Sequence, residues 1–263
     1  MNTDLATLIK KNNYHCLFLS PHADDVILSC GSLLSRLVGK TDITVLTVFT
    51  KAHEKPYTLS AKQFMKYSNN FADAQALYDV RVEEDKNAFA RLGITPINLG
   101  FEDALFRRKK HRTFLGKFLP EFDHIYPTYR WHILKKIASD DSAISELTKQ
   151  LPTYVKKNTL VFAPFGLGNH ADHKVVRLVS EKLFDNLILY SDFPYNIRLN
   201  TYGQTPKAYT RYEVPVDKKK KDKLLHLYET QYRGLFPVGT TPDHKEVFFV
   251  KNTNALTEVK GKK

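Results

Sequence analysis

The chain has 263 residues, of which 42% are hydrophobic and 12% aromatic, a composition that excludes a wholly disordered protein. Forty lysines and arginines against 28 aspartates and glutamates give a net charge of +12, which raises the question of a nucleic-acid or anionic partner. The two cysteines, Cys16 and Cys30, exclude a disulfide framework and favour a reducing compartment. Because there is no signal-peptide pattern and no run of about 18 apolar residues, we expect a cytoplasmic protein without a membrane span.

The first 50 residues predict a β-α-β unit. Residues 15–20 form a short apolar run that ends at Pro21, as a buried strand does. Apolar side chains then recur at helical spacing from Val26 to Leu37, and residues 43–49 predict a second strand. A helical crossover of this kind joins parallel strands.

The same alternation continues along the chain. Repeated β-α units predict an α/β fold, an open and mostly parallel Rossmann-like sheet with helices on both faces, in three layers. Neither a repeat nor a Gly/Ser linker divides residues 1–263, so we expect one domain, with an insertion at about 101–150 that breaks the rhythm. The further predicted strands are 96–99, 159–163, 187–191, 208–214 and 245–250, and the further predicted helices are near 84–92, 175–183 and 218–232.

Polar clusters follow two of the predicted strands. His22, Asp24 and Asp25 stand between the first strand and its helix, and residues 169–173 (Asn-His-Ala-Asp-His) follow the strand at 159–163. Ligands of open α/β sheets bind outside the carboxyl ends of the strands. We therefore expect the two clusters to meet at one edge of the sheet.

The residue types of these clusters suit a catalytic metal. His22 and Asp25 are three residues apart at a helix start, so their side chains can converge on one point. A histidine from the second cluster would complete a set of three ligands and leave a position open for water, as in catalytic zinc sites. A metal lowers the pKa of such a water towards about 7, and Asp24 can accept its proton. The same ligands also suit Fe²⁺, but ferrous triads usually sit on β-barrels, so we expect Zn²⁺.

Other interpretations remain open at this point. Asp24 can simply cap a helix, and acidic residues are common near helix starts. The run Gly166-Leu-Gly-Asn-His-Ala171, with Asp192 about 20 residues on, matches the dinucleotide fingerprint and would indicate an NAD(P)-binding oxidoreductase. The basic runs 107–112 and 218–221 would suit a nucleic-acid binder, although such runs are more often solvated faces.

These motifs resemble those of the PIG-L/LmbE-like N-deacetylases, metal-dependent enzymes that remove acetyl groups from N-acetylglucosamine-type amino sugars. The two main signatures stand here as residues 20–32 (SPHADDVILSCGS) and 170–173 (HADH). Residues 81–93, 100–103 and 221–231 are similar to the family's middle helix, a substrate-facing segment and the closing helix. Val26 and Ser32 depart from the family pattern, which usually has Glu and a second Gly at these positions.

The resemblance implies a zinc-dependent hydrolase that removes an N-acetyl group from an amino-sugar substrate, with a metal-bound water as the nucleophile. It implies His22, Asp25 and His173 as metal ligands, Asp24 as general base, His170 as oxyanion stabiliser, Asp172 as a residue that orients a histidine, and Arg81 and Asp103 as sugar-facing residues. The basic charge lies away from this acidic centre. It therefore suggests an anionic sugar or glycoconjugate as the partner, captured with the help of residues 107–110, rather than a nucleic acid.

Overall fold

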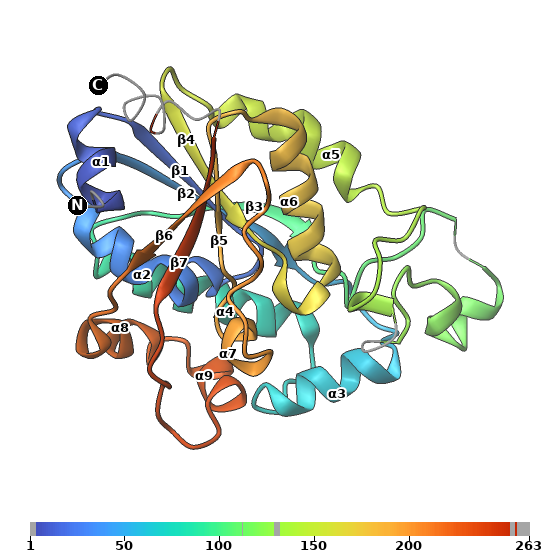
Figure 1. Cartoon of the computed structure of the whole chain (residues 1–263). Coiled ribbons are helices and arrows are strands. Elements are labelled where there is room, and N and C mark those ends of the chain that lie inside the picture. The colour runs from blue at the N-terminus through green and yellow to red at the C-terminus, as the bar shows by residue number, and fades with distance from the viewer. Residues whose placement is uncertain (1–3, 112, 129–131, 253–255, 257–263) are drawn as a thin grey trace.

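The computed structural model describes residues 4–111, 113–128, 132–252 and 256. Its strands form one sheet in the order β3-β2-β1-β4-β5-β7-β6, and helices cover both faces (Figure 1), so the predicted three-layer α/β/α fold is confirmed. The strands are β1 (His15–Ser20), β2 (Asp42–Lys51), β3 (Ile97–Glu102), β4 (Thr159–Pro164), β5 (Leu187–Tyr190), β6 (Tyr209–Val214) and β7 (Glu246–Lys251). β1 to β5 pair with one another in parallel, whereas β7 runs antiparallel to both β5 and β6.

The helices divide between the two faces of the sheet. Because side chains alternate along a strand, Cys16 and Phe18 of β1 join the core that contains α1, α2, α8 and α9, whereas Leu17 and Leu19 join the core that contains α5 and α6. The helices are α1 (Leu5–Lys11), α2 (Asp25–Leu37), α3 (Leu59–Tyr67), α4 (Ala74–Ala90), α5 (Ala143–Gln150), α6 (Ala171–Leu183), α7 (Tyr195–Arg198), α8 (Lys218–Leu225) and α9 (Glu229–Leu235). No helix within the described ranges is long and apolar enough to cross a membrane.

The strand order fixes where a ligand can bind. β1 pairs in parallel with β2 on one side and with β4 on the other. The chain leaves β1 for α2 on one face and leaves β4 for α6 on the opposite face. A crevice opens where connections diverge in this way, so the carboxyl ends of β1 and β4 are the expected site.

The predicted helix 218–232 is in fact two helices, α8 and α9. The helix is interrupted between them because buried carboxylates of α4 accept hydrogen bonds from residues at the start of α9. The hydroxyl of Tyr228 donates to Asp85 at 2.8 Å, and the amide and hydroxyl of Thr230 donate to Glu84 at 2.8 and 2.6 Å. The Thr230 amide is a donor that a continuous helix would have paired internally, and here Glu84 satisfies it.

Some elements were not expected. The short helices α1 and α3 lack a long apolar face and were not predicted, and α4 begins at Ala74, before the predicted helix near 84–92, with Leu77 and Tyr78 buried in its first half. Residues 101–102 belong to β3 and α5 packs against α6, so the irregular part of the expected insertion, in the residues that the structure describes, is 103–111, 113–128 and 132–142. That this segment is an insertion relative to the family stays a prediction.

Lys221 lies within the basic run 218–221, yet it is only 2% exposed. Its Nζ donates to Glu246 Oε1 at 2.8 Å, and the same carboxylate accepts the amides of Ser32 and Leu33 at 2.7 and 2.9 Å. One buried ion pair thus joins α8, β7 and α2. The interpretation of this run as a solvated or nucleic-acid-binding face is therefore wrong for Lys221.

Replacing Lys221 leaves the Glu246 carboxylate buried without its cation. We expect Lys221→Ala to lower the free energy of unfolding by about 3–5 kcal/mol, the usual cost of breaking a buried pair. Lys219→Ala is the matched control, because Lys219 is exposed in the same helix and its loss should cost less than about 0.5 kcal/mol. Urea unfolding followed by circular dichroism measures both, and equal effects would contradict a structural role for the pair.

Candidate active site

The two polar clusters lie at the carboxyl ends of β1 and β4, as predicted. After β1 the chain turns sharply: the Ser20 hydroxyl donates to the His22 carbonyl at 2.7 Å and accepts the Val26 amide at 3.1 Å. Asp24 sits in this turn with φ 150° and ψ −31°, a conformation that L-amino acids rarely adopt. Strained backbone conformations of this kind cluster at functional sites, and Asp24 lies directly before α2.

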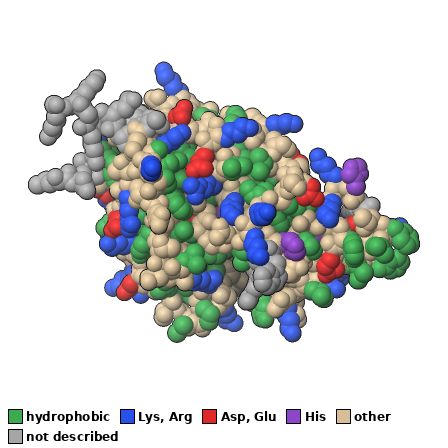
Figure 2. Space-filling view, turned by 45° about the vertical axis from the view of Figure 1, so that its right-hand side comes forward, with side chains coloured by type: hydrophobic (Ala, Val, Ile, Leu, Met, Phe, Trp, Pro, Cys, Tyr) green, Lys and Arg blue, Asp and Glu red, His purple; other side chains and the backbone are tan. Residues whose placement is uncertain are grey.

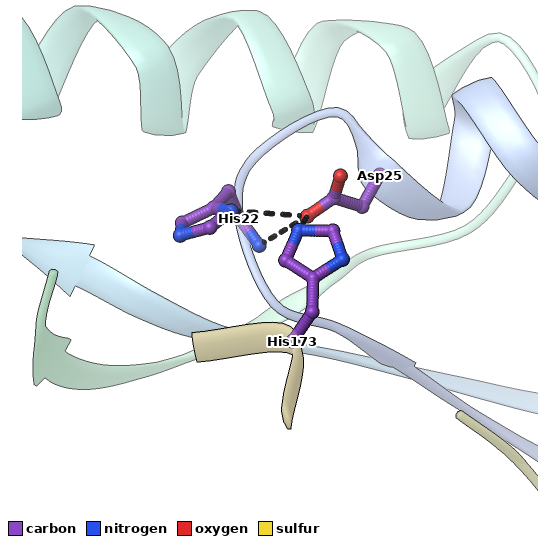
Figure 3. A group of neighbouring side chains, drawn as sticks. All are labelled: His22, Asp25 and His173. Atoms are coloured by element: carbon purple, nitrogen blue, oxygen red, sulfur yellow. Dashed lines mark hydrogen bonds and ion pairs between the residues drawn. The ribbon is translucent and has the colours of Figure 1, made fainter. Parts of the chain in front are cut away.

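His22, Asp25 and His173 bring three possible ligand atoms together (Figure 3). His22 Nδ1 lies 3.1 Å from Asp25 Oδ2, and His173 Nε2 lies 3.3 Å from the same oxygen. The three ligand atoms are all within 4.8 Å of one another, and all three residues are buried. Two imidazole nitrogens and one carboxylate oxygen are a donor set suited to Zn²⁺ or Fe²⁺.

Each of these histidines has its other nitrogen held by a carboxylate. His173 Nδ1 lies 2.7 Å from Asp192 Oδ1, and His22 Nε2 lies 3.2 Å from Asp172 Oδ2 and 3.3 Å from Asp103 Oδ2. Carboxylates in this position fix the tautomer and the ring orientation of metal-binding histidines. The residues present therefore fit a divalent cation in both the ligand set and its support.

The adjacent carboxylates of Asp24 and Asp25 differ in their environment. Burial raises the pKa of Asp24, and the charge of Asp25 raises it further. Burial acts on Asp25 too, but His173 and His22 outweigh it and hold the pKa of Asp25 well below its usual range. Asp24 lines a small cavity beside this cluster and makes no side-chain capping hydrogen bond to the described part of α2, so the helix-cap interpretation is wrong. One carboxylate thus suits a cation and the other suits a proton.

His170 precedes α6 and lines the same cavity. Its Nδ1 accepts the Asp172 amide at 3.2 Å, which leaves the ring proton on Nε2. Burial and the nearby charge of His22 lower the pKa of His170 to about 3. The ring is therefore neutral and offers an N–H donor.

Arg81 and Asp103, the two residues expected to face a sugar, both line a cavity of about 130 Å³ at this site. Arg81 donates to Gln231 Oε1 at 2.6 Å, and its buried Nε has no hydrogen-bond partner among the described residues. Gln231 Nε2 donates in turn to the Ala23 carbonyl at 2.7 Å, which ties α9 to the β1–α2 turn. Gln231 stands in the closing motif of the sequence, but nothing there indicates that it lines the cavity.

Arg107 is a site residue that sequence reasoning missed. The basic run 107–112 predicts a solvated face, yet Arg107 is only 6% exposed. Its guanidinium donates to Asp172 Oδ1 and to Asp141 Oδ2, both at 2.5 Å. Asp172 contacts His22 with its other oxygen, so Arg107 supports the cluster from behind.

The other residues of that run differ from Arg107. Lys109 and Lys110 are exposed, and Arg112 lies outside the described residues. The expected capture of an anionic substrate by residues 107–110 is wrong for Arg107, whose charge is paired inside the protein. It stays a prediction for the exposed lysines.

The glycine-rich run 166–171 has another role than binding a dinucleotide. Asp192, the acid that would bind the ribose, contacts His173 instead. Gly168 has a φ of +79°, and a Cβ there would lie 2.3 Å from Cδ1 of Tyr195. The tyrosine ring thus covers the backbone that a pyrophosphate would have to approach, which argues against the oxidoreductase alternative.

A family model and a curated protein each match more than half of the chain. The PIG-L family model, described as GlcNAc-PI de-N-acetylase, matches residues 17–184. The 2'-N-acetylparomamine deacetylase of Niallia circulans is 27% identical over 266 residues, which cover 90% of this chain and 91% of that protein.

Solved structures share the fold. A deacetylase of teicoplanin biosynthesis, crystallised with teicoplanin, superposes with a TM-score of 0.68 at 20% identity and covers 90% of this chain and 97% of its own. The N,N'-diacetylchitobiose deacetylase of Pyrococcus horikoshii gives 0.54 at 15% identity and covers 97% and 92%. Since the family model matches more than half of the sequence, the chain belongs to the PIG-L family of metal-dependent de-N-acetylases.

Proposed function

We propose that the chain hydrolyses the N-acetyl group of an acetylated amino sugar, with Zn²⁺ held by His22, Asp25 and His173. The observation that carries the proposal is this buried cluster, supported by outer carboxylates and opening on a cavity with a second carboxylate and a neutral histidine. A divalent cation at the cluster would polarise the amide carbonyl and lower the pKa of a water. The relatives named for paromamine and chitobiose support an amino sugar as the substrate class.

Asp24 is the proposed general base. Its carboxylate faces the cavity, and its raised pKa gives it the proton affinity that a base needs near neutral pH. It would take a proton from the attacking water and pass it to the departing nitrogen as the C–N bond breaks. The second proton of the water also ends on this nitrogen, so the products are acetate and the ammonium form of the amine, and atoms and charges balance.

His170 is the proposed oxyanion donor. Because its pKa is lowered to about 3, the ring donates its Nε2 proton in a hydrogen bond without giving it up. The Asp172 amide on Nδ1 fixes this tautomer. Asp172 therefore serves two histidines: it orients His170 with its backbone and His22 with its carboxylate.

Arg81 and Asp103 are the proposed sugar contacts. The cavity of about 130 Å³ is smaller than the ~300–1,000 Å³ of pockets that enclose a whole small molecule. We infer that the acetamido end enters the cavity and that the rest of the substrate lies at its mouth. The donors of Arg81 and the carboxylate of Asp103 would then bind hydroxyl groups of the sugar beside it.

Asp24→Asn should keep the metal and lose turnover. General bases contribute about 10²- to 10⁴-fold, so we expect kcat to fall within that range. His173→Ala should instead lose the metal, because it removes a ligand. Acetate release from a panel that includes 2'-N-acetylparomamine measures activity, and elemental analysis of protein purified without added metal measures content and distinguishes zinc from iron.

The exposed Asp185 provides the matched control, since Asp185→Asn makes the same chemical change far from the cluster. It should match the wild type in both measurements. Full activity in Asp24→Asn would remove Asp24 as the base. Normal metal content in His173→Ala would remove His173 as a ligand.

Arg107→Ala should weaken metal binding although Arg107 is no ligand. The loss frees Asp172, and outer-shell changes of this kind typically cost about 10- to 100-fold in metal affinity or activity. Arg107→Lys should recover only part of the loss, because an ammonium cannot reproduce the forked contact to two carboxylates. Chelator competition measures the affinity, and thermal melting shows whether each variant is folded.

Lys109→Ala is the control for charge alone, because Lys109 is exposed in the same run. Its metal affinity and kcat should equal those of the wild type. If Arg107→Ala changed only a salt-dependent KM, as Lys109→Ala would under substrate steering, the supporting role of Arg107 would be refuted.

A further inference from the structure

A protruding segment outside the active site exposes a cluster of apolar side chains. Residues 114–122, the apolar tip, carry five of the thirteen large hydrophobic side chains that are exposed in the described part of the chain. Figure 2 shows apolar side chains gathered at the protruding right-hand end of the molecule, where the green segment between β3 and α5 projects in Figure 1. The five are Phe114, Leu115, Phe118, Leu119 and Phe122, between 49% and 75% exposed. Apolar surface concentrated in this way marks an interaction site.

The backbone of the apolar tip is held in place at its base. Asp123 accepts the amide and the hydroxyl of Thr113 at 2.7 and 2.9 Å, and its carbonyl accepts the Lys109 amide at 2.8 Å. Gly116 lies against the same carboxylate, where a Cβ would come within 2.0 Å of its Cγ. The turn therefore closes around Asp123 and leaves the apolar side chains on its outside.

The surroundings of the apolar tip are basic. The tip contacts α3, since Glu121 Oε1 accepts the Leu59 amide at 3.0 Å. Exposed lysines lie before the tip, within it and along α3, whereas the acidic side chains Glu121 and Asp123 are half-buried and buried. The lysines are Lys109, Lys110, Lys117, Lys62 and Lys66.

We propose that the apolar tip docks on an anionic lipid bilayer, with its aromatic and leucine side chains in the interfacial layer and the lysines on the headgroup phosphates. Apolar side chains flanked by cations are the combination that binds such interfaces. The tip projects outward, so it can insert into the interface of a bilayer, which is fluid and needs no preformed groove. A symmetric contact between two copies would bring the lysines of both tips together, and like charges across an interface are unfavourable.

Docking would also place the cavity near the lipid headgroups. α3 begins beside the tip at Leu59, and Phe64, on the same helix, lines the cavity. The inference does not rest on the proposed deacetylation, because lipid binding is measured without any substrate.

The experiment uses the full chain and vesicles of phosphatidylcholine alone or of equal parts phosphatidylcholine and phosphatidylglycerol. Cosedimentation should show binding to the anionic vesicles, about tenfold weaker binding to the neutral ones, and release as salt rises. Phe114→Ser/Phe118→Ser should weaken binding at least about tenfold, because two aromatic side chains leave the interface. Lys109→Glu/Lys110→Glu should reduce the preference for anionic lipid, because each lysine near an anionic surface contributes about fivefold in binding.

Two control variants carry comparable changes elsewhere. Leu178→Ser/Val238→Ser removes two exposed apolar side chains, and Lys219→Glu/Lys220→Glu reverses two exposed lysines of α8. Both should bind as the wild type does. Melting temperatures establish that every variant is folded.

Three results would overturn the proposal: no binding of the wild type to anionic vesicles, equal losses in the controls and the tip variants, or a wild-type dimer in sedimentation velocity that the tip variants convert to monomer. Acetate release without vesicles is scored separately, and Phe114→Ser/Phe118→Ser should keep it. Lost activity with retained lipid binding, or the reverse, therefore tests the two proposals independently.

Discussion

A continuous series of contacts between basic and acidic side chains runs through the buried site, and the surrounding structure depends on keeping these charges paired. It passes from Arg107 through Asp172, His22, Asp25 and His173 to Asp192, with links of 2.5, 3.2, 3.1, 3.3 and 2.7 Å. Each of these groups, buried alone, would cost several kcal/mol. Each of four segments contributes one or two of these side chains, so all four must come together in the fold. They are the β1–α2 turn with the start of α2, the start of α6, the segment after β5 and the segment that carries Arg107.

The protonation state of the two histidines in this series explains why a divalent cation suits the site. Burial lowers the pKa of His22, but hydrogen bonds to Asp172 and Asp25 and the charge of Asp103 outweigh it and raise it to about 9. Burial also opposes protonation of His173, and Asp25 and Asp192 overcome it. Without a metal, the carboxylates thus keep both imidazoles protonated, with one additional proton and one positive charge on each ring. A divalent cation supplies the same two positive charges and leaves both imidazoles neutral, as ligands must be.

The sequence predicts the parts of the site that follow from local rules. The parallel β-α pattern places His22, Asp25 and His173 at one sheet edge, because each follows the carboxyl end of its strand. Arg107 lies outside such rules: it stands in a basic run whose Lys109 and Lys110 are exposed, and its partner Asp172 is 65 residues away. Asp192 shows the same limit. Its distance from the glycine-rich run suggests a ribose contact, and only the packed structure shows its contact with His173.

The basic residues of the chain fall into two groups that composition cannot separate. Arg107 and Lys221 stand in basic runs, yet each is buried against carboxylates, where its charge adds nothing to the field outside the protein. The lysines beside them are exposed and carry the net charge of +12 to the surface. Runs of this kind form because a buried cation needs only one position, while its helix or loop neighbours face water. The partner that a basic protein attracts is therefore set by the position of its exposed lysines, and here several of them surround the apolar tip.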